Sequence, residues 1–343
     1  MGNLIKIQCV NNNASIEVEM GTSLLELATK LDLEGKYPPL AAYVNNKLKE
    51  LNYLVYTPAK VEFFDISHLA GFRVYQRSMI FIMQAVASKL YPTQKFHARH
   101  AIGDSIYCEV EGKTEFSTEE CQALYNAAQS IVEQNLPIIR EKLPTEDVIA
   151  EFAKRGFDDK VALLQTRQRL YSTIQRLGDE VGYFFGALVP STGYIDRFEI
   201  RPYHNGFYIS IPSRTAPDTI APPPNLQKMF SIFDGYSEWV EIMGVATVGK
   251  LNKRIEQGDT SEMIQIAEAL HEKRLSRIAD TIAQANRERG LRLVLISGPS
   301  SSGKTTTSKR LGVQLRVLGL HPVLVSTDDY FVNREDTDRK STV

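Results

Sequence analysis

The sequence predicts a multidomain protein that combines α+β and α/β domains. Three observations support this fold class. Alternating apolar runs surround one short helical segment near the N-terminus, prolines cluster at 212–224, and an apolar run leads through a glycine-rich loop into a helical segment after residue 290. A chain of 343 residues, 43% of them hydrophobic, is long enough for two or three domains with ordinary cores.

Residues 1–66 predict a small α+β domain. Alternating apolar runs at 4–10 and 15–20 flank Asn11-Asn12-Asn13, which is typical of a β-hairpin because asparagine tolerates a positive φ at the turn. Ser23, followed three residues later by Glu26, predicts a capping box at the start of a helix.

This region resembles the TGS domain, a β-grasp module found at the N-termini of threonyl-tRNA synthetases. The residues that carry the resemblance are 20–28 and 42–47. The resemblance implies a β-grasp fold that contacts RNA or a small ligand and has no catalytic role.

Residues 67–213 predict a second α+β domain, similar to the editing domain of threonyl-tRNA synthetases. The segment 77–90 is apolar on nearly all sides, which predicts a buried helix that stops before Pro92. The segment 83–92 resembles the first helix of the editing domain, and 189–198 resembles its closing motif.

The catalytic residues of that editing domain are absent from this sequence. Editing in the family depends on an H-x-x-x-H pair on the first helix and on a cysteine and a histidine just before the closing motif. Here 75–81 contains no histidine, and 183–188 reads Tyr-Phe-Phe-Gly-Ala-Leu. Without metal ligands or a polar group to activate water, we expect no hydrolytic editing and a binding or spacer role instead.

Residues 214–289 predict a proline-rich connector followed by a long helix. The prolines at 222–224 stiffen the chain and lack N–H donors, as expected at a domain boundary. The segment 261–289 is amphipathic and leads directly into the apolar run at 291–297.

A phosphate-binding loop is predicted at Gly298-Pro299-Ser300-Ser301-Ser302-Gly303-Lys304-Thr305, which fits the Walker A pattern G-x-x-x-x-G-K-[ST]. In such a loop the backbone N–H groups surround phosphates, the lysine reaches the β- and γ-phosphates, and the hydroxyl binds Mg²⁺. A strand at 291–297 and a helix at 306–318 would provide the required strand–loop–helix order. The alternative is a serine-rich turn. The predicted ATP-binding residues are Gly298, Ser300, Ser301, Ser302, Gly303, Lys304, Thr305 and Thr306, with Thr305 as a ligand of Mg²⁺.

A second strand is predicted at 322–327, followed by Asp328-Asp329-Tyr330-Phe331. Here the sequence resembles the uridine kinase and phosphoribulokinase group of P-loop kinases, in which an acid-aromatic motif ends the second strand. The resemblance implies that Asp328 accepts the proton of the substrate hydroxyl and assists Mg²⁺, with Lys304 as the second catalytic residue. An Asp-Asp pair can also act as a turn or helix cap.

The sequence therefore predicts an ATP-dependent nucleoside kinase of the uridine type that forms a 5′-monophosphate. Residues 290–343 would provide only the N-terminal part of such a kinase domain, so we expect the domain to be truncated. The alternative is a non-catalytic regulatory protein that binds nucleotide or RNA and retains a phosphate loop without turnover. The identity of the nucleoside, the choice between ATP and GTP, and the oligomeric state are left open.

The overall composition excludes several other classes of protein. The 40 lysines and arginines nearly balance the 41 aspartates and glutamates, so RNA binding would need a local basic patch. Three cysteines without C-x-x-C spacing indicate neither a disulfide framework nor a zinc site. No signal peptide or long apolar segment is evident, so we expect a cytoplasmic protein with no membrane partner.

Overall fold

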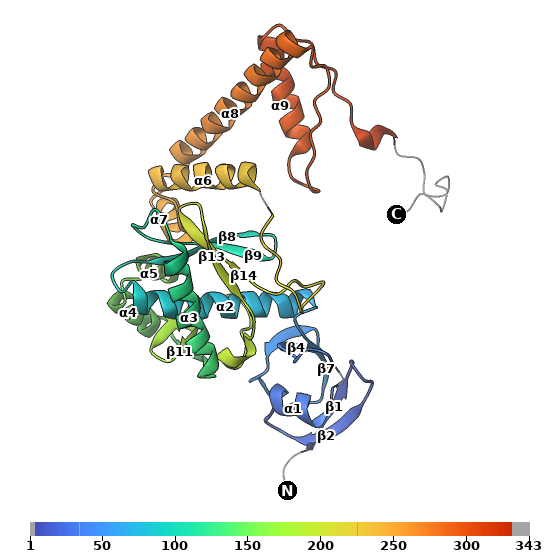
Figure 1. The fold of residues 1–343 in the computed structure, drawn as a ribbon, viewed down its shortest axis with the longest axis vertical. Coiled ribbons are helices and arrows are strands. Elements are labelled where there is room, and N and C mark those ends of the chain that lie inside the picture. The colour runs from blue at the N-terminus through green and yellow to red at the C-terminus, as the bar shows by residue number, and fades with distance from the viewer. Residues whose placement is uncertain (1–3, 34, 225, 331–343) are drawn as a thin grey trace. The chain divides into compact units, whose positions relative to one another are not determined.

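The computed structural model describes residues 4–33, 35–224 and 226–330. The chain divides after Lys250 into two compact units, which we describe separately. The first unit contains mixed α/β domains, as the sequence predicts (Figure 1). No helix in the described part of the chain is both long enough and apolar enough to cross a membrane.

The first unit begins with a five-stranded sheet that packs against helix α1 (Leu24–Lys30). In sheet order, the strands are β2 (Ser15–Glu19), β1 (Leu4–Cys9), β7 (Ala59–Phe64), β4 (Ala41–Val44) and β5 (Lys47–Glu50). Strands β1 and β7 are parallel, and the other pairs are antiparallel. A short ladder joins β3 (Thr22–Ser23) to β6 (Leu54–Val55). The predicted hairpin is confirmed as β1–β2, and the predicted capping box forms between Ser23 and Glu26.

The rest of the first unit is built around the long helix α2 (Leu69–Leu90), which has twelve buried residues, as its apolar sequence predicts. One antiparallel sheet has the order β13 (Glu199–Tyr203), β14 (Gly206–Ser210), β9 (Ser105–Val110) and β8 (Phe96–Ile102). A second contains β10 (Ile138–Pro144), β11 (Tyr171–Leu177) and β12 (Glu180–Gly182). The helices are α3 (Thr118–Glu133), α4 (Thr145–Lys154), α5 (Asp158–Gln165) and the 3₁₀ turn η1 (Thr192–Tyr194).

Helix α2 is longer than predicted, because it begins at Leu69 rather than near residue 77. Its N-cap is His68, whose side chain accepts a hydrogen bond from the amide of Ala70. Gly71 permits a close approach at this end, since a Cβ there would lie 1.8 Å from the carbonyl oxygen of Asp65. The core around α2 includes Leu40 and Ile66, so the apolar packing is continuous across the predicted domain boundary at residue 66.

The helices α6 (Gln227–Ile242) and α7 (Val248–Glu256) follow the proline-rich connector. Phe230 of α6 packs with Ile102 and Tyr107, and the ring of His204 stacks on the ring of Phe230 at a centroid distance of 3.8 Å. These contacts attach α6 to the sheet that contains β8 and β9.

The described part of the second unit contains the end of α7, the helices α8 (Thr260–Arg289) and α9 (Lys304–Val317), and the short 3₁₀ helix η2 (Thr327–Tyr330). Its small core consists of Leu275, Ala279, Leu311 and Leu315. The long helix predicted at 261–289 is confirmed as α8, which ends at Gly290 with a left-handed φ of 66°.

The strands predicted at 291–297 and 322–327 do not form in the described residues, so this unit lacks the expected α/β core. Leu295 is 83% exposed and Val323 is 87% exposed, although both were expected inside a sheet. A parallel strand is stable when neighbouring strands pair with it and helices cover both of its faces. The described part of the unit provides one helical hairpin and no strand, so the apolar runs remain exposed.

Candidate functional site

The predicted phosphate loop forms a tight turn at the N-terminus of α9. Ser301 (φ 61°) and Gly303 (φ 81°) both have left-handed backbone conformations. The Nζ of Lys304 donates hydrogen bonds to the carbonyl oxygens of Gly298 (2.9 Å) and Pro299 (2.8 Å). The lysine thus closes the loop on itself, and the turn residues 300–303 are exposed.

Of the other predicted residues of this site, two threonines directly follow the loop, whereas Asp328 forms no hydrogen bond with it among the described residues. Thr305 and Thr306 lie in the first turn of α9, directly after Lys304. Asp328 lies in η2, where its backbone N–H donates to the Oγ of Ser326 at 3.3 Å. Among the described residues, the Asp328 carboxylate forms no hydrogen bond or ion pair with the loop.

In the first unit, the polar side chains of α2 bind the backbone of 187–197. Tyr75 donates its hydroxyl proton to the carbonyl of Arg197 (2.7 Å) and accepts from the amide of the same residue (2.9 Å). Burial raises the pKa of Tyr75, so the hydroxyl stays protonated and continues to donate. Ser78 accepts from the amide of Val189 at 3.0 Å, and Arg77 donates two hydrogen bonds to the carbonyl of Ala187. These side chains hold a neighbouring segment in place and are not free to act on a ligand.

The two segments that would supply editing residues are brought together, but aromatic rings fill the space between them. Phe81 of α2 and Phe184 lie with ring centroids 5.2 Å apart. A Cβ on Gly182 would lie 2.4 Å from the Phe184 ring and 2.9 Å from the Phe81 ring, so the packing leaves no room for a larger residue. Within the described residues, no group of three histidine, cysteine or acidic side chains could hold a metal ion.

The segment that resembles the closing motif forms hydrogen bonds with the C-terminal end of α3. Asn135 follows that helix with a left-handed φ of 47°, and its Oδ1 accepts from the Ser191 hydroxyl (2.6 Å) and the Gly193 amide (3.1 Å). The buried Thr192 hydroxyl donates to the carbonyl of Ile131 at 2.7 Å. It also accepts from the amide of Leu136 at 2.9 Å. The motif therefore has a structural role here, which its sequence alone does not reveal.

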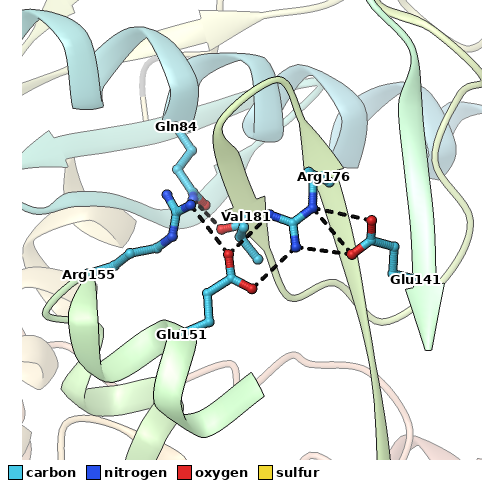
Figure 2. Close-up of polar contacts among 6 residues, drawn as sticks. All are labelled: Gln84, Glu141, Glu151, Arg155, Arg176 and Val181. Carbon is cyan, nitrogen blue, oxygen red and sulfur yellow. Dashed lines mark hydrogen bonds and ion pairs between the residues drawn. The ribbon is translucent and has the colours of Figure 1, made fainter. Parts of the chain in front are cut away.

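A charged network joins β10, β11 and α4 (Figure 2). Arg176 lies between two carboxylates and donates to Glu141 (3.0 Å) and to Glu151 (3.0 Å). Arg155 also reaches Glu151 at 3.4 Å. The hydrogen bonds from Arg176 lower the pKa of Glu151, and the same contacts raise the pKa of Arg176. Each of these four side chains has a partner of opposite charge, which indicates that the network has a structural role.

Comparison with known proteins finds relatives of about half of the chain. No family model matches the chain. Over 191 residues, 55% of its length, it is 28% identical to a threonine–tRNA ligase of Clostridium kluyveri. It is 26% identical over 186 residues to that of Syntrophomonas wolfei and 29% identical over 163 residues to that of Acidithiobacillus ferrooxidans. These matches span 30%, 29% and 25% of the length of the three relatives.

About half of the chain is homologous to threonyl-tRNA synthetases. The homology lies in the region that resembles the TGS and editing domains.

The prediction of a nucleoside kinase is wrong. The relatives found are ligases that act on a tRNA, a different enzyme class from a phosphotransferase, and no comparison supports the resemblance to uridine kinases. That resemblance depended on about 50 residues, and the two strands it required do not form. The nucleoside substrate is not supported either. The catalytic roles expected of Lys304 and Asp328 depended on the kinase interpretation and stay untested predictions. The alternative of a nucleotide- or RNA-binding protein fits the relatives better.

Proposed function

We propose that the first unit is a non-catalytic tRNA-binding module, composed of a TGS-type β-grasp domain and an editing-type domain. The observation that carries the proposal is the 28% identity over 191 residues to a protein named as a threonine–tRNA ligase. Function lies in the sites that a fold carries, so a module can lose its catalytic residues and still retain a binding surface on the same scaffold.

The packing between α2 and the segment before the closing motif supports binding without chemistry. Activation of water requires a metal ion or a general base within hydrogen-bonding distance of the reacting atom. The rings of Phe81 and Phe184 pack against each other between the two segments, and the side chains of Arg77 and Ser78 form hydrogen bonds with backbone atoms. These contacts favour a rigid scaffold over a hydrolytic site.

The proposal is tested by binding and deacylation measurements on the full chain. Fluorescence anisotropy with a labelled tRNA transcript, against duplex DNA of similar length at the same salt concentration, separates recognition of tRNA from non-specific attraction to phosphates. We expect tRNA to bind at least about tenfold more tightly than the DNA, since non-specific binding of this kind has a Kd of roughly 10⁻⁴ to 10⁻⁶ M. Mischarged tRNA should lose its amino acid no faster than in buffer. Equal affinity for the two nucleic acids, or rapid deacylation, would contradict the proposal.

We also propose that the loop at 298–306 binds phosphate groups, with ATP and Mg²⁺ as the nucleotide and cation expected from its sequence. Ser301 and Gly303 have the left-handed conformations from which anion-binding backbone nests are built, and the loop precedes the N-terminus of α9. Thr305 would provide a hydroxyl for Mg²⁺.

Isothermal titration of the chain with ATP and Mg²⁺ tests this second proposal. Lys304→Met should weaken binding at least about tenfold, because it removes the cation that faces the terminal phosphates. Lys309→Met, on the same helix, is the matched control and should leave the affinity unchanged. If wild-type protein binds no ATP, the loop is a serine-rich turn.

A further inference from the structure

A groove of about 580 Å³ lies between two strands of the first unit that belong to different sheets. One is β5, at the edge of the first sheet, and the other is β10, at the edge of the three-stranded sheet. The residues that matter for the argument are Lys49, Asn52, Tyr53, Tyr56, Ile139 and Arg140, all of which line the groove.

An ion pair spans the groove. Arg140 donates from Nη1 to the Oε1 of Glu50 at 3.1 Å. The Glu50 side chain is only 13% exposed, and burial raises its pKa, whereas the Arg140 side chain is 51% exposed. A guanidinium has five N–H donors, so Arg140 keeps donors directed to solvent after it has neutralised Glu50. Arg140 is thus a fixed cation with free capacity for an anion.

A lysine and a tyrosine are paired on the β5 side of this groove. The Nζ of Lys49 lies 4.3 Å from the ring centroid of Tyr53, and Tyr56 nearby is exposed. Beyond the residues that line the groove, the Nζ of Lys142 on β10 lies 5.2 Å from the ring centroid of the exposed Tyr171 on β11. Each pair presents a flat aromatic surface next to a positive charge.

Arg140 and Lys142 continue the positive charge along β10. They are two residues apart, so they share a face of the strand and lie roughly 6.8 Å apart along it. The intervening Glu141 is on the other face, where Arg176 binds it. The acidic residues Glu146 and Asp147 lie in the first turn of α4, directly after β10, so the positive charge along β10 ends there.

We infer that this groove and the adjoining face of β10 and β11 bind single-stranded RNA. Bases would stack on Tyr53, Tyr56 and Tyr171, and phosphates would be bound by Lys49, Arg140 and Lys142. The inference rests on the proposed tRNA-binding function and names the surface responsible. Exposed aromatic rings beside cations are the means by which proteins bind unpaired nucleotides, because every base has a face that can stack.

Two unpaired strand edges could also add an extended peptide as an extra strand. The observations favour RNA, since one lysine–tyrosine pair lies in the groove and a second lies further along β10 and β11. Among the described residues, the only acidic side chain that lines the groove is already paired. A peptide ligand is an outcome that the experiment distinguishes.

The experiment uses the full chain and a labelled twelve-nucleotide oligouridine, followed by fluorescence anisotropy. Tyr53→Ala/Tyr56→Ala should weaken RNA binding at least tenfold. Lys49→Gln/Lys142→Gln should reduce the slope of log Kd against log salt concentration by about 1.4, because each contact with a single-strand phosphate contributes about 0.7. Tyr236→Ala and Lys228→Gln, at exposed positions on α6, are matched controls and should leave both quantities unchanged. Thermal melting by circular dichroism checks that every variant is folded.

The outcomes separate this inference from the proposed function. If wild-type protein binds tRNA and the groove variants bind both RNAs as tightly as wild type, the groove is not the site, although tRNA binding stands. If wild-type protein binds neither RNA, the proposed function itself fails. If a labelled oligoglutamate peptide binds in place of RNA and the groove variants abolish that binding, the groove is a peptide site and the inference is overturned.

Discussion

Replacing Thr192 with valine tests whether the segment that resembles the closing motif stabilises the fold through its hydrogen bonds to the end of α3. Valine has the shape of threonine but lacks the hydroxyl that donates to Ile131 (2.7 Å) and accepts from Leu136 (2.9 Å). Thr192 is fully buried, so water cannot replace either partner. An unsatisfied buried polar group costs about 1–3 kcal/mol, and two polar groups lose their partner here, so we expect a loss of about 2–6 kcal/mol in the free energy of unfolding.

Chemical denaturation monitored by circular dichroism would measure this loss. Thr29→Val is the matched control, because the Thr29 hydroxyl donates to the carbonyl of Leu25 within its own helix at an exposed position. That change should stay within about 0.5 kcal/mol of wild type. In a protein of this size, 1 kcal/mol corresponds to a change in Tm of roughly 2–4 °C, so Thr192→Val should lower Tm by at least about 4 °C. Equal losses for the two variants would refute the structural role of the motif.

Three further predictions concern the charged network and the glycines. Arg176→Met should lower the free energy of unfolding at neutral pH by about 1–3 kcal/mol, because it removes the charged hydrogen bonds to Glu141 and Glu151. Since the folded-state pKa of Glu151 lies below its unfolded value of about 4.3, the network contributes fully above that pH and loses its contribution as pH falls through the folded pKa. The difference in urea unfolding between wild type and Arg176→Met should therefore shrink toward pH 3, and a constant difference would contradict the assignment. Gly71→Ala should destabilise by at least about 2 kcal/mol, because its Cβ would clash with the Asp65 carbonyl at 1.8 Å. Gly235→Ala, in open space within α6, should instead stabilise by about 0.5–1 kcal/mol, and a melting curve for each variant checks the opposite signs.

Local signals in the sequence were sufficient for several elements. Ser23 and Glu26 predict the capping box that the structure contains, because both hydrogen bonds join residues three positions apart. The asparagines at 11–13 predict the β1–β2 hairpin, and the apolar pattern at 77–90 predicts a buried helix. In each case the residues that determine the structure are neighbours in the chain.

The phosphate loop illustrates where local signals were insufficient. The apolar runs at 291–297 and 322–327 have the composition of buried strands but form no strand in the described structure and are largely exposed. A strand forms hydrogen bonds to other strands, so its formation depends on partners that its own sequence does not specify. The kinase prediction failed because it assumed such partners from a short motif.

The groove between β5 and β10 was equally hidden from sequence reasoning. The lysines and tyrosines at 47–56 are visible in the sequence, but Arg140 and Tyr171 lie about 90 and 120 residues further along the chain. No spacing rule connects these residues, and the net charge of −1 gives no sign that basic side chains gather along β10.

The sequence alone determined which short segments form helices and hairpins, and it showed that the editing histidines are missing. The tertiary structure decided which distant residues meet, since only folding brings Phe81 of α2 against Phe184 and Thr192 against the end of α3. The physical reason is that capping and turn formation depend on neighbouring residues. The filling of a site and the alignment of charges along a groove depend instead on residues that meet only when distant segments pack together.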